Sequence, residues 1–135
     1  MTPSRVRADL LGEHFELRRL IEEARVILRS GNDAARVDLP AAVERLADAL
    51  HGHSQHEEAA LRVVLATVQG RAHPDAVMDE HHVAEHARLV AVLRAGVDDS
   101  DTSVVQEKIG AVLDELESHM AHEEDMLLGP DLLGD

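Results

Sequence analysis

The sequence predicts an all-α protein in which four antiparallel helices form an up-down-up-down bundle. Apolar residues recur at three- and four-residue spacing in four segments, the connections between the segments are short, and no segment alternates in the manner of a strand. Phe15 is the only Phe, Tyr or Trp, so the core must be built from Leu, Val, Ile and Ala. The 135 residues are expected to form one domain, with its core at about 5–128 and a short C-terminal tail.

The first two helical segments are separated by a turn sequence. The first runs over about 5–29 and stops at SGND, residues 30–33. The second is predicted to open at Asp38, because Pro40 is tolerated in the first turn of a helix, and to run to about Val68.

The last two segments are also bounded by turn signals. The third begins after His73-Pro74 and ends near Gly96. The fourth follows the sequence DDSD, whose Ser100 or Asp101 is expected to cap the helix, and it stops at Gly129-Pro130.

Charge and cysteine content exclude several classes of partner and site. A formal net charge of −14 repels nucleic acid and anionic membranes. No apolar run approaches the roughly 20 residues of a membrane span, and the N-terminus MTPSRVRADLLGEHF lacks a signal-peptide core. We therefore expect a cytoplasmic protein with no nucleic-acid or membrane partner. The absence of Cys excludes disulfides, thiolate zinc sites and iron–sulfur clusters.

Every helical segment carries His or Glu in an otherwise aliphatic inward stripe. Ten residues are His, about three times ordinary usage. Because a buried polar group costs several kcal/mol, on the order of 2–7, unless it has a partner, the interruptions are expected to share one. They are His14 in the first segment, His53 and Glu57 in the second, His82 and His86 (with Glu85 beside it) in the third, and His119 and Glu123 in the fourth.

The spacing of these residues is that of a metal site. The i, i+4 pairs His53/Glu57, His82/His86 and His119/Glu123 each lie on one helix face, and His14 adds a fourth contribution. Five imidazoles and two carboxylates are too many for one metal ion, but they suit two ions if both carboxylates bridge them. Imidazole and carboxylate without thiolate suit Fe, Mn or Zn.

The chain also repeats itself. HSQHEEAAL at 53–61 aligns with HMAHEEDML at 119–127, and GEHFELRRLI at 12–21 echoes AEHARLVAVL at 84–93. Two copies of a helix pair would bring equivalent ligands together near a pseudo-two-fold axis.

Two alternatives remain open within this ligand set. His81 competes with His82 in the same turn, and Glu124 lies five residues after His119, so it competes with Glu123. His81 is otherwise expected at the rim of the site.

The remaining polar residues of the repeated turns lie off the stripes. His51, Glu58 and Glu124 are expected to face solvent. His56 and His122 flank the ligand face in both copies and are predicted to be partly exposed. The alternative is that each hydrogen-bonds to a metal ligand from outside the site.

Four residues near the pattern are assigned no metal role. Phe15 is expected to pack in the core. Arg18 and Arg19 follow His14 by about one turn and are expected as surface charges rather than anion binders, and His73 is expected in a loop. No Ser/His/Asp set or phosphate-binding loop is apparent, so no catalytic residue is predicted.

The ordered set of one His, HxxxE, HxxxH and a second HxxxE resembles the hemerythrin-like (HHE cation-binding) family. The resemblance covers about residues 8–128 and includes the doubled Glu after HxxH. It implies a four-helix bundle with a non-haem di-iron centre, bridged by carboxylates and often by an oxo or hydroxo group. The ligands carried over by position are His14, His53, Glu57, His82, His86, His119 and Glu123.

Three functions follow as hypotheses. In the first, two Fe ions bind or turn over a small diatomic or peroxide ligand (O2, NO or peroxide), with Zn or Mn as alternative metals and a weak oxidant-reactive activity as the enzymatic form. In the second, the bundle senses, buffers or regulates iron without catalysis, because metal binding would stabilise its buried ligands. In the third, the chain is a metal-free interaction bundle.

Overall fold

The computed structural model describes residues 3–67, 80–96 and 101–126, of which the side chains at 3–4, 32–36, 61–67, 80–82, 102 and 126 are not described. The described residues form four helices and no strand, so the prediction of an all-α fold is confirmed. The helices are α1 (Pro3–Arg29), α2 (Asn32–Thr67), α4 (Glu80–Gly96) and α5 (Thr102–Met126).

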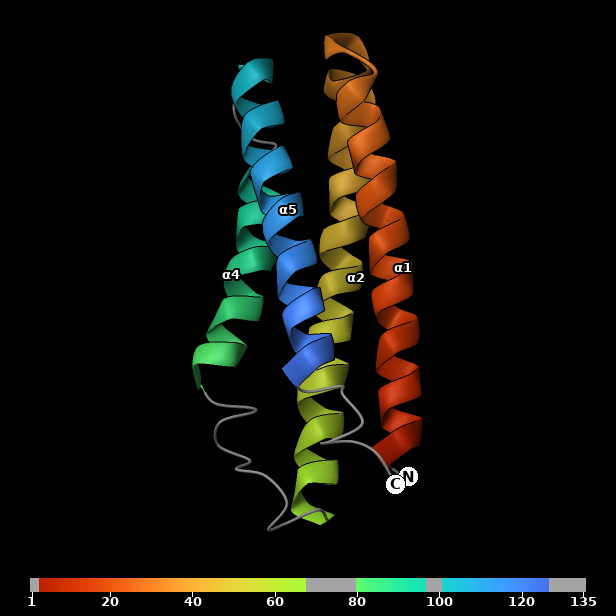
Figure 1. Cartoon of the computed structure of the whole chain (residues 1–135). Helices are drawn as coiled ribbons and strands as arrows, with labels where there is room; N and C mark the ends of the chain where they lie inside the picture. Colours follow the sequence, from red (N-terminus) through yellow and green to blue (C-terminus); the bar gives the residue numbers. More distant parts are fainter. Residues whose placement is uncertain (1–2, 68–79, 97–100, 127–135) are drawn as a thin grey trace.

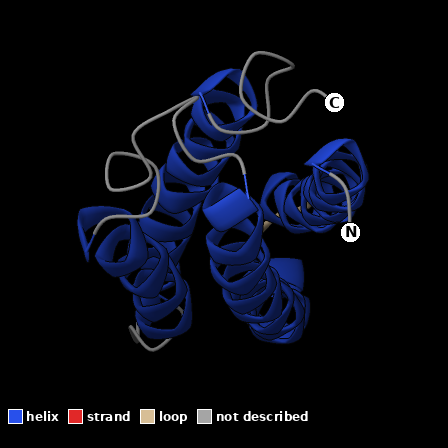
Figure 2. Ribbon diagram, turned by 90° about the horizontal axis from the view of Figure 1, so that it is seen from below, coloured by secondary structure: helices blue, strands red, loops and turns tan. Residues whose placement is uncertain are grey.

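The four helices pack as an antiparallel bundle (Figure 1). The pairs α1/α2 and α4/α5 lie side by side, α2 also packs on α4, and α1 also packs on α5. Viewed along the bundle, the four helices surround a common axis (Figure 2). Each helix therefore turns one face inward, which is the arrangement that the apolar stripes require.

The turn between α1 and α2 is shorter than predicted. Gly31 adopts a φ of 107°, a left-handed conformation that glycine takes without a Cβ clash. Ser30 closes the end of α1 by donating its backbone N–H to Ile27 O (3.1 Å) and its hydroxyl to Val26 O (2.7 Å). Because two residues complete the turn, α2 begins at Asn32 rather than at Asp38, and the predicted start is wrong. Pro40 consequently lies inside the helix, where its ring is exposed.

The N-terminus of α5 is capped as predicted by one of the two candidates. Asp101 Oδ1 accepts a hydrogen bond from the backbone N–H of Ser103 (2.9 Å), and Asp101 O accepts one from Val105 (3.0 Å). The predicted boundaries at His73-Pro74 and Gly129-Pro130 lie outside the described residues.

Aliphatic side chains fill the bundle along most of its length. Leu17 and Ile21 of α1 and Leu46 of α2 are buried, and each buried Leu or Ile contributes roughly 1.5–3 kcal/mol. Phe15, predicted in the core, is 72% exposed, so that prediction is wrong. It lies about 100° around the helix from the inward-facing His14, and its ring therefore faces outward.

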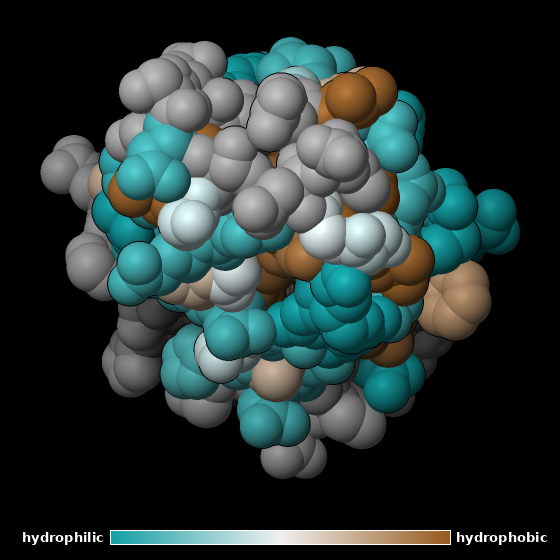
Figure 3. All heavy atoms as spheres, turned by 90° about the horizontal axis from the view of Figure 1, so that it is seen from above, coloured by the Kyte–Doolittle hydropathy of each residue, from teal (hydrophilic) through white to brown (hydrophobic). Residues whose placement is uncertain are grey.

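One end of the bundle can be seen in the space-filling view. The described residues at this end are largely hydrophilic, with apolar side chains showing between them (Figure 3). None of the helices in the described ranges is both long enough and apolar enough to cross a bilayer.

Candidate metal centre

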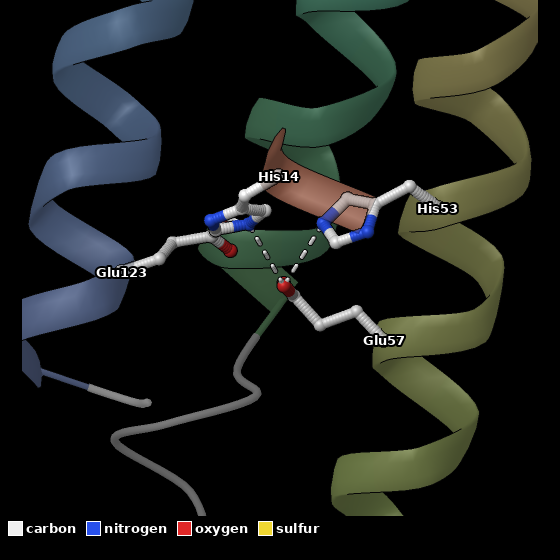
Figure 4. A group of neighbouring side chains, drawn as sticks. All are labelled: His14, His53, Glu57 and Glu123. Atoms are coloured by element: carbon white, nitrogen blue, oxygen red, sulfur yellow. Dashed lines mark ion pairs between the residues drawn. The ribbon is translucent and has the colours of Figure 1, made fainter. Parts of the chain in front are cut away.

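Four side chains from three helices converge where the aliphatic stripes are interrupted (Figure 4). His14 comes from α1, His53 and Glu57 from α2, and Glu123 from α5. Each is at most 5% exposed. The helix period explains the convergence, because each of these residues continues the face that carries the buried leucines of its own helix.

Glu57 faces histidines on both sides of the bundle axis. Its Oε2 lies 3.2 Å from His53 Nε2 and 3.9 Å from His14 Nε2. Its Oε1 lies 3.4 Å from His86 Nε2. One carboxylate is thus shared between the first helix pair and α4.

Glu123 divides its oxygens in the same way. Its Oε1 lies 3.3 Å from His14 Nε2. Its Oε2 lies 3.2 Å from His86 Nε2 and 3.5 Å from His119 Nε2. Both glutamates therefore present one oxygen to histidines of the first helix pair and the other to His86, and Glu123 also faces His119.

The described ligand atoms form two groups that share Glu123. In each group the candidate atoms lie within 4.8 Å of one another. The first group is His14, His53, Glu57 and Glu123, and the second is His86, His119 and Glu123. Six of the seven ligands predicted from the sequence are thus brought together. The side chains of His82 and of its alternative His81 lie outside the described part of the chain.

The sequence repeat reappears as repeated geometry. The rings of His14 and His53 meet edge to face with centroids 4.8 Å apart, and those of the equivalent residues His86 and His119 do so at 4.9 Å. The two helix pairs therefore place their histidines alike, as a pseudo-two-fold arrangement requires.

Three carboxylates hold the outer nitrogens of the central histidines. Nδ1 lies 2.8 Å from Glu124 Oε2 in His14, 2.6 Å from Glu13 Oε1 in His53 and 3.3 Å from Glu58 Oε1 in His86. A carboxylate that accepts a hydrogen bond from Nδ1–H fixes the tautomer in which Nε2 carries the lone pair. This is the form in which imidazole binds a metal ion through Nε2.

Glu58 and Glu124 were expected to face solvent, and that prediction is wrong. Each follows an inward-facing glutamate by 100° of helix rotation, which directs it to the neighbouring helix instead of to water. The doubled Glu in HxxHEE could have indicated this contact with the neighbouring helix, because only its first Glu lies on the inward stripe. Glu123 lies among the inward-facing histidines, and its alternative Glu124 lies on the outer nitrogen of His14.

Arg18, expected to be a plain surface charge, holds Glu124 in place. Its Nη1 and Nη2 donate to the two oxygens of Glu124 at 2.7 and 2.9 Å, a fork that fits a carboxylate. The guanidinium lowers the pKa of Glu124, and the carboxylate in turn raises the pKa of Arg18. Glu124 is therefore kept as an anion against His14.

His53 is surrounded by carboxylates, which change its pKa. Burial disfavours a charged ring, but the carboxylates of Glu57 and Glu13 outweigh it, and the pKa of His53 is raised. Glu13 also binds Nδ1 of the exposed His56 at 2.5 Å, so His56 is exposed as predicted and touches an outer partner of the centre. His51 and His122 are exposed, as expected, whereas His73 lies outside the described residues.

The donor set fits divalent cations. Nε2 of His14 and of His53 are buried, and neither has a hydrogen-bond partner among the described residues. Buried nitrogens of this kind are stable when a cation accepts their lone pairs, and two adjacent carboxylates offset its charge.

Replacing Arg18 with Met is expected to lower the affinity for the first bound cation about 10- to 100-fold, because Glu124 loses the group that holds it against His14. Zinc titration by calorimetry measures this effect. Arg19→Met is the matched control, since Arg19 is exposed and pairs with Glu16 on its own helix. Equal zinc affinity in the two variants would show that the outer carboxylate does not position His14.

The model of the hemerythrin HHE cation binding domain matches residues 5–129. No curated protein and no solved structure matches the chain.

Proposed function

The chain belongs to the family of hemerythrin HHE cation-binding domains, and on this premise we propose that it holds two iron ions side by side and lets them react with a small oxidant such as O2, NO or peroxide. The observation that carries the proposal is the division of oxygens in Glu57 and Glu123. Each carboxylate faces histidines of both groups. Two cations at these positions would share both carboxylates as bridges.

The proposed ligand assignment follows the two groups. His14 and His53 would hold the first ion. His86 and His119 would hold the second, with His82 as a further ligand. Glu57 and Glu123 would bridge, and together they would offset half of the charge of two divalent ions. Mn and Zn accept the same donors, so the choice of iron rests on the oxidant chemistry.

Iron would supply reversible one-electron chemistry, so that two ions together exchange two electrons with one oxidant. Side chains around the ions would orient their ligands. Glu13, Glu58 and Glu124 orient the imidazoles. Buried leucines such as Leu10, Leu17 and Leu50, each within about one helical turn of a proposed ligand, would limit the room for a large substrate beside the ions.

Iron sensing or buffering without catalysis is the second candidate function. It is supported by burial among the described side chains, where six polar residues lie in an otherwise aliphatic interior: His14, His53, Ser54, Glu57, His86 and Glu123. Most of these would be stabilised by a cation, so the bundle would tighten when iron binds. This function predicts a rise in stability with iron but no turnover of an oxidant.

Anaerobic loading with Fe(II), followed by exposure to O2 or peroxide, tests the proposal. We expect two iron ions per chain and, after oxidation, a yellow to orange protein with near-ultraviolet charge-transfer bands. Two ions per chain with neither colour change nor oxidant consumption would favour sensing or buffering. Well under one iron per chain would refute both iron functions.

A further inference from the structure

The candidate metal centre is buried, so an ion needs a route to it from solvent. A pocket of about 230 Å³ lies between α1 and α2 on the outer side of His53. Its wall includes Glu13, Glu16, Leu17, Ala49, Gly52 and His53. Among the described residues, His53 is the one that both lines this pocket and belongs to a group of candidate ligands. The His53 ring therefore stands between the pocket and the centre.

The His53 ring is held from both sides. Its Nδ1 lies 2.6 Å from Glu13 Oε1 on the side of the pocket. Its Nε2 lies 3.2 Å from Glu57 Oε2 on the side of the centre (Figure 4). An ion cannot pass through the ring, so entry from the pocket requires the ring to turn aside. An ion that binds the Glu13 carboxylate would take the place of the Nδ1 hydrogen bond and release the ring on that side.

Gly52 directly precedes His53 inside α2 and weakens the helix at this turn. A Cβ added at Gly52 would meet no packed atom within 4 Å, so packing does not require glycine here. Relative to alanine, a glycine inside a helix makes local opening easier by roughly fivefold. Gly12, which precedes Glu13 in α1, has equally open surroundings. The two residues between the pocket and the centre thus both follow a helix-weakening glycine.

The second half of the chain closes the equivalent place. The positions of Glu16 and Ala49 are taken there by Arg88 and Glu115. Arg88 donates hydrogen bonds to Glu85 on its own helix and to Glu115 on α5, so a charged side chain spans the gap between the helices. The positions of the two glycines are taken by Ala84 and Ser118. The sequence repeat therefore favours the first helix pair as the side on which an ion enters.

The charge of the pocket favours cations. Glu13 and Glu16 both line it, the first partly exposed and the second exposed. Arg19 pairs with Glu16, whereas the ion pairs of Glu13 among the described residues are with His53 and His56. The net charge of −14 also raises the local concentration of divalent cations and repels anions.

We propose that divalent metal ions enter the centre through this pocket, passing Glu13 while the His53 ring turns aside at the Gly52 turn. The inference rests on the proposed function, since it requires a metal centre that includes His53, but it is independent of the oxidant. Ions that enter by this route also leave by it. A change confined to the route therefore alters uptake and release by the same factor and leaves the affinity unchanged.

Stopped-flow mixing of the metal-free protein with zinc and a coloured zinc indicator measures uptake, and release from the loaded protein to excess chelator measures the outward rate. Gly52→Ala should slow both rates roughly fivefold, because alanine makes the turn harder to open. Ala49→Leu, which fills the pocket, should slow both by about tenfold or more. Calorimetry should give the wild-type zinc affinity for both variants.

Gly110→Ala is the matched control, because Gly110 lies inside α5 and has equally open surroundings. It should raise the melting temperature as Gly52→Ala does, but it should leave both rates unchanged. Equal slowing in the two glycine variants would show that ions enter by general opening of the bundle, and would overturn the proposal. Wild-type rates in either pocket variant would overturn it as well. If Ala49→Leu does not fold, as judged by circular dichroism, Gly52→Ala decides the matter.

Zinc separates this inference from the oxidant chemistry, because zinc is not redox-active. Uptake and release slowed only in the pocket variants would support the route even if the iron-loaded protein consumed no oxidant. Zinc binding at equal rates in all the proteins would overturn the route and leave the metal centre standing. A wild type that takes up no zinc would overturn the route and the metal centre together.

Discussion

Replacing Glu57 with Gln is expected to reduce the iron content of the loaded protein from two ions per chain to less than one. The change keeps the size of the side chain and removes its charge. Glu57 faces His53 with one oxygen and His86 with the other, so both proposed ions lose a ligand at once. Breaking a buried charge pair costs about 3–5 kcal/mol, which corresponds to roughly a 200- to 5,000-fold loss of affinity.

Metal analysis after Fe(II) loading and desalting measures this effect. Glu44→Gln is the matched control on the same helix, because Glu44 is exposed and pairs with Arg94 at the surface. The control should retain two ions. Two ions per chain in the Glu57→Gln protein would show that this carboxylate does not bridge them.

Iron should also raise the melting temperature of the wild-type protein by roughly 10–20 °C. Free Fe(II) at a thousand times its dissociation constant stabilises the folded chain by about 4 kcal/mol, and each kcal/mol raises Tm by about 3–5 °C for a chain of this size. The added stability has a physical source: a bound ion would become the partner of buried polar atoms. Nε2 of His14 and of His53 lacks a hydrogen-bond partner among the described residues.

Calorimetry of the protein with and without Fe(II), under anaerobic conditions, measures this rise. His53→Ala should lose most of the rise, because it removes a proposed ligand. His51→Ala, two residues earlier and exposed, should keep it. Identical melting of the wild type with and without iron would favour a metal-free interaction bundle instead.

Positions on the inward stripes were predictable from the sequence. Leu46, Leu50, His53 and Glu57 follow one another at three- and four-residue spacing, and all four are buried. The reason is local: in a straight helix the direction of a side chain follows from its number in the chain. The same rule, applied to four segments, identified the six candidate ligand residues that the structure places together.

Residues beside the stripes were not predictable in this way. Glu58, Glu124 and Arg18 lie where a single helix gives no sign of whether water or a neighbouring helix is adjacent. The prediction for Phe15 was wrong for a related reason. Its apolar ring suggested burial, but its position on α1 lies on the outward face of the helix. The start of α2 depended on Gly31, whose left-handed conformation made a two-residue turn sufficient.

The sequence by itself determined that the chain is a bundle of helices, which side chains point inward and that these are His and Glu at metal-ligand spacing. These properties depend on the period of one helix, which the order of residues specifies directly. Only the tertiary structure decided that each glutamate gives one oxygen to each group of histidines, and that Glu13, Glu58 and Glu124 hold the outer nitrogens. Those contacts depend on the rotation and level of each helix relative to its neighbours, which are set by how the side chains of all four helices pack together.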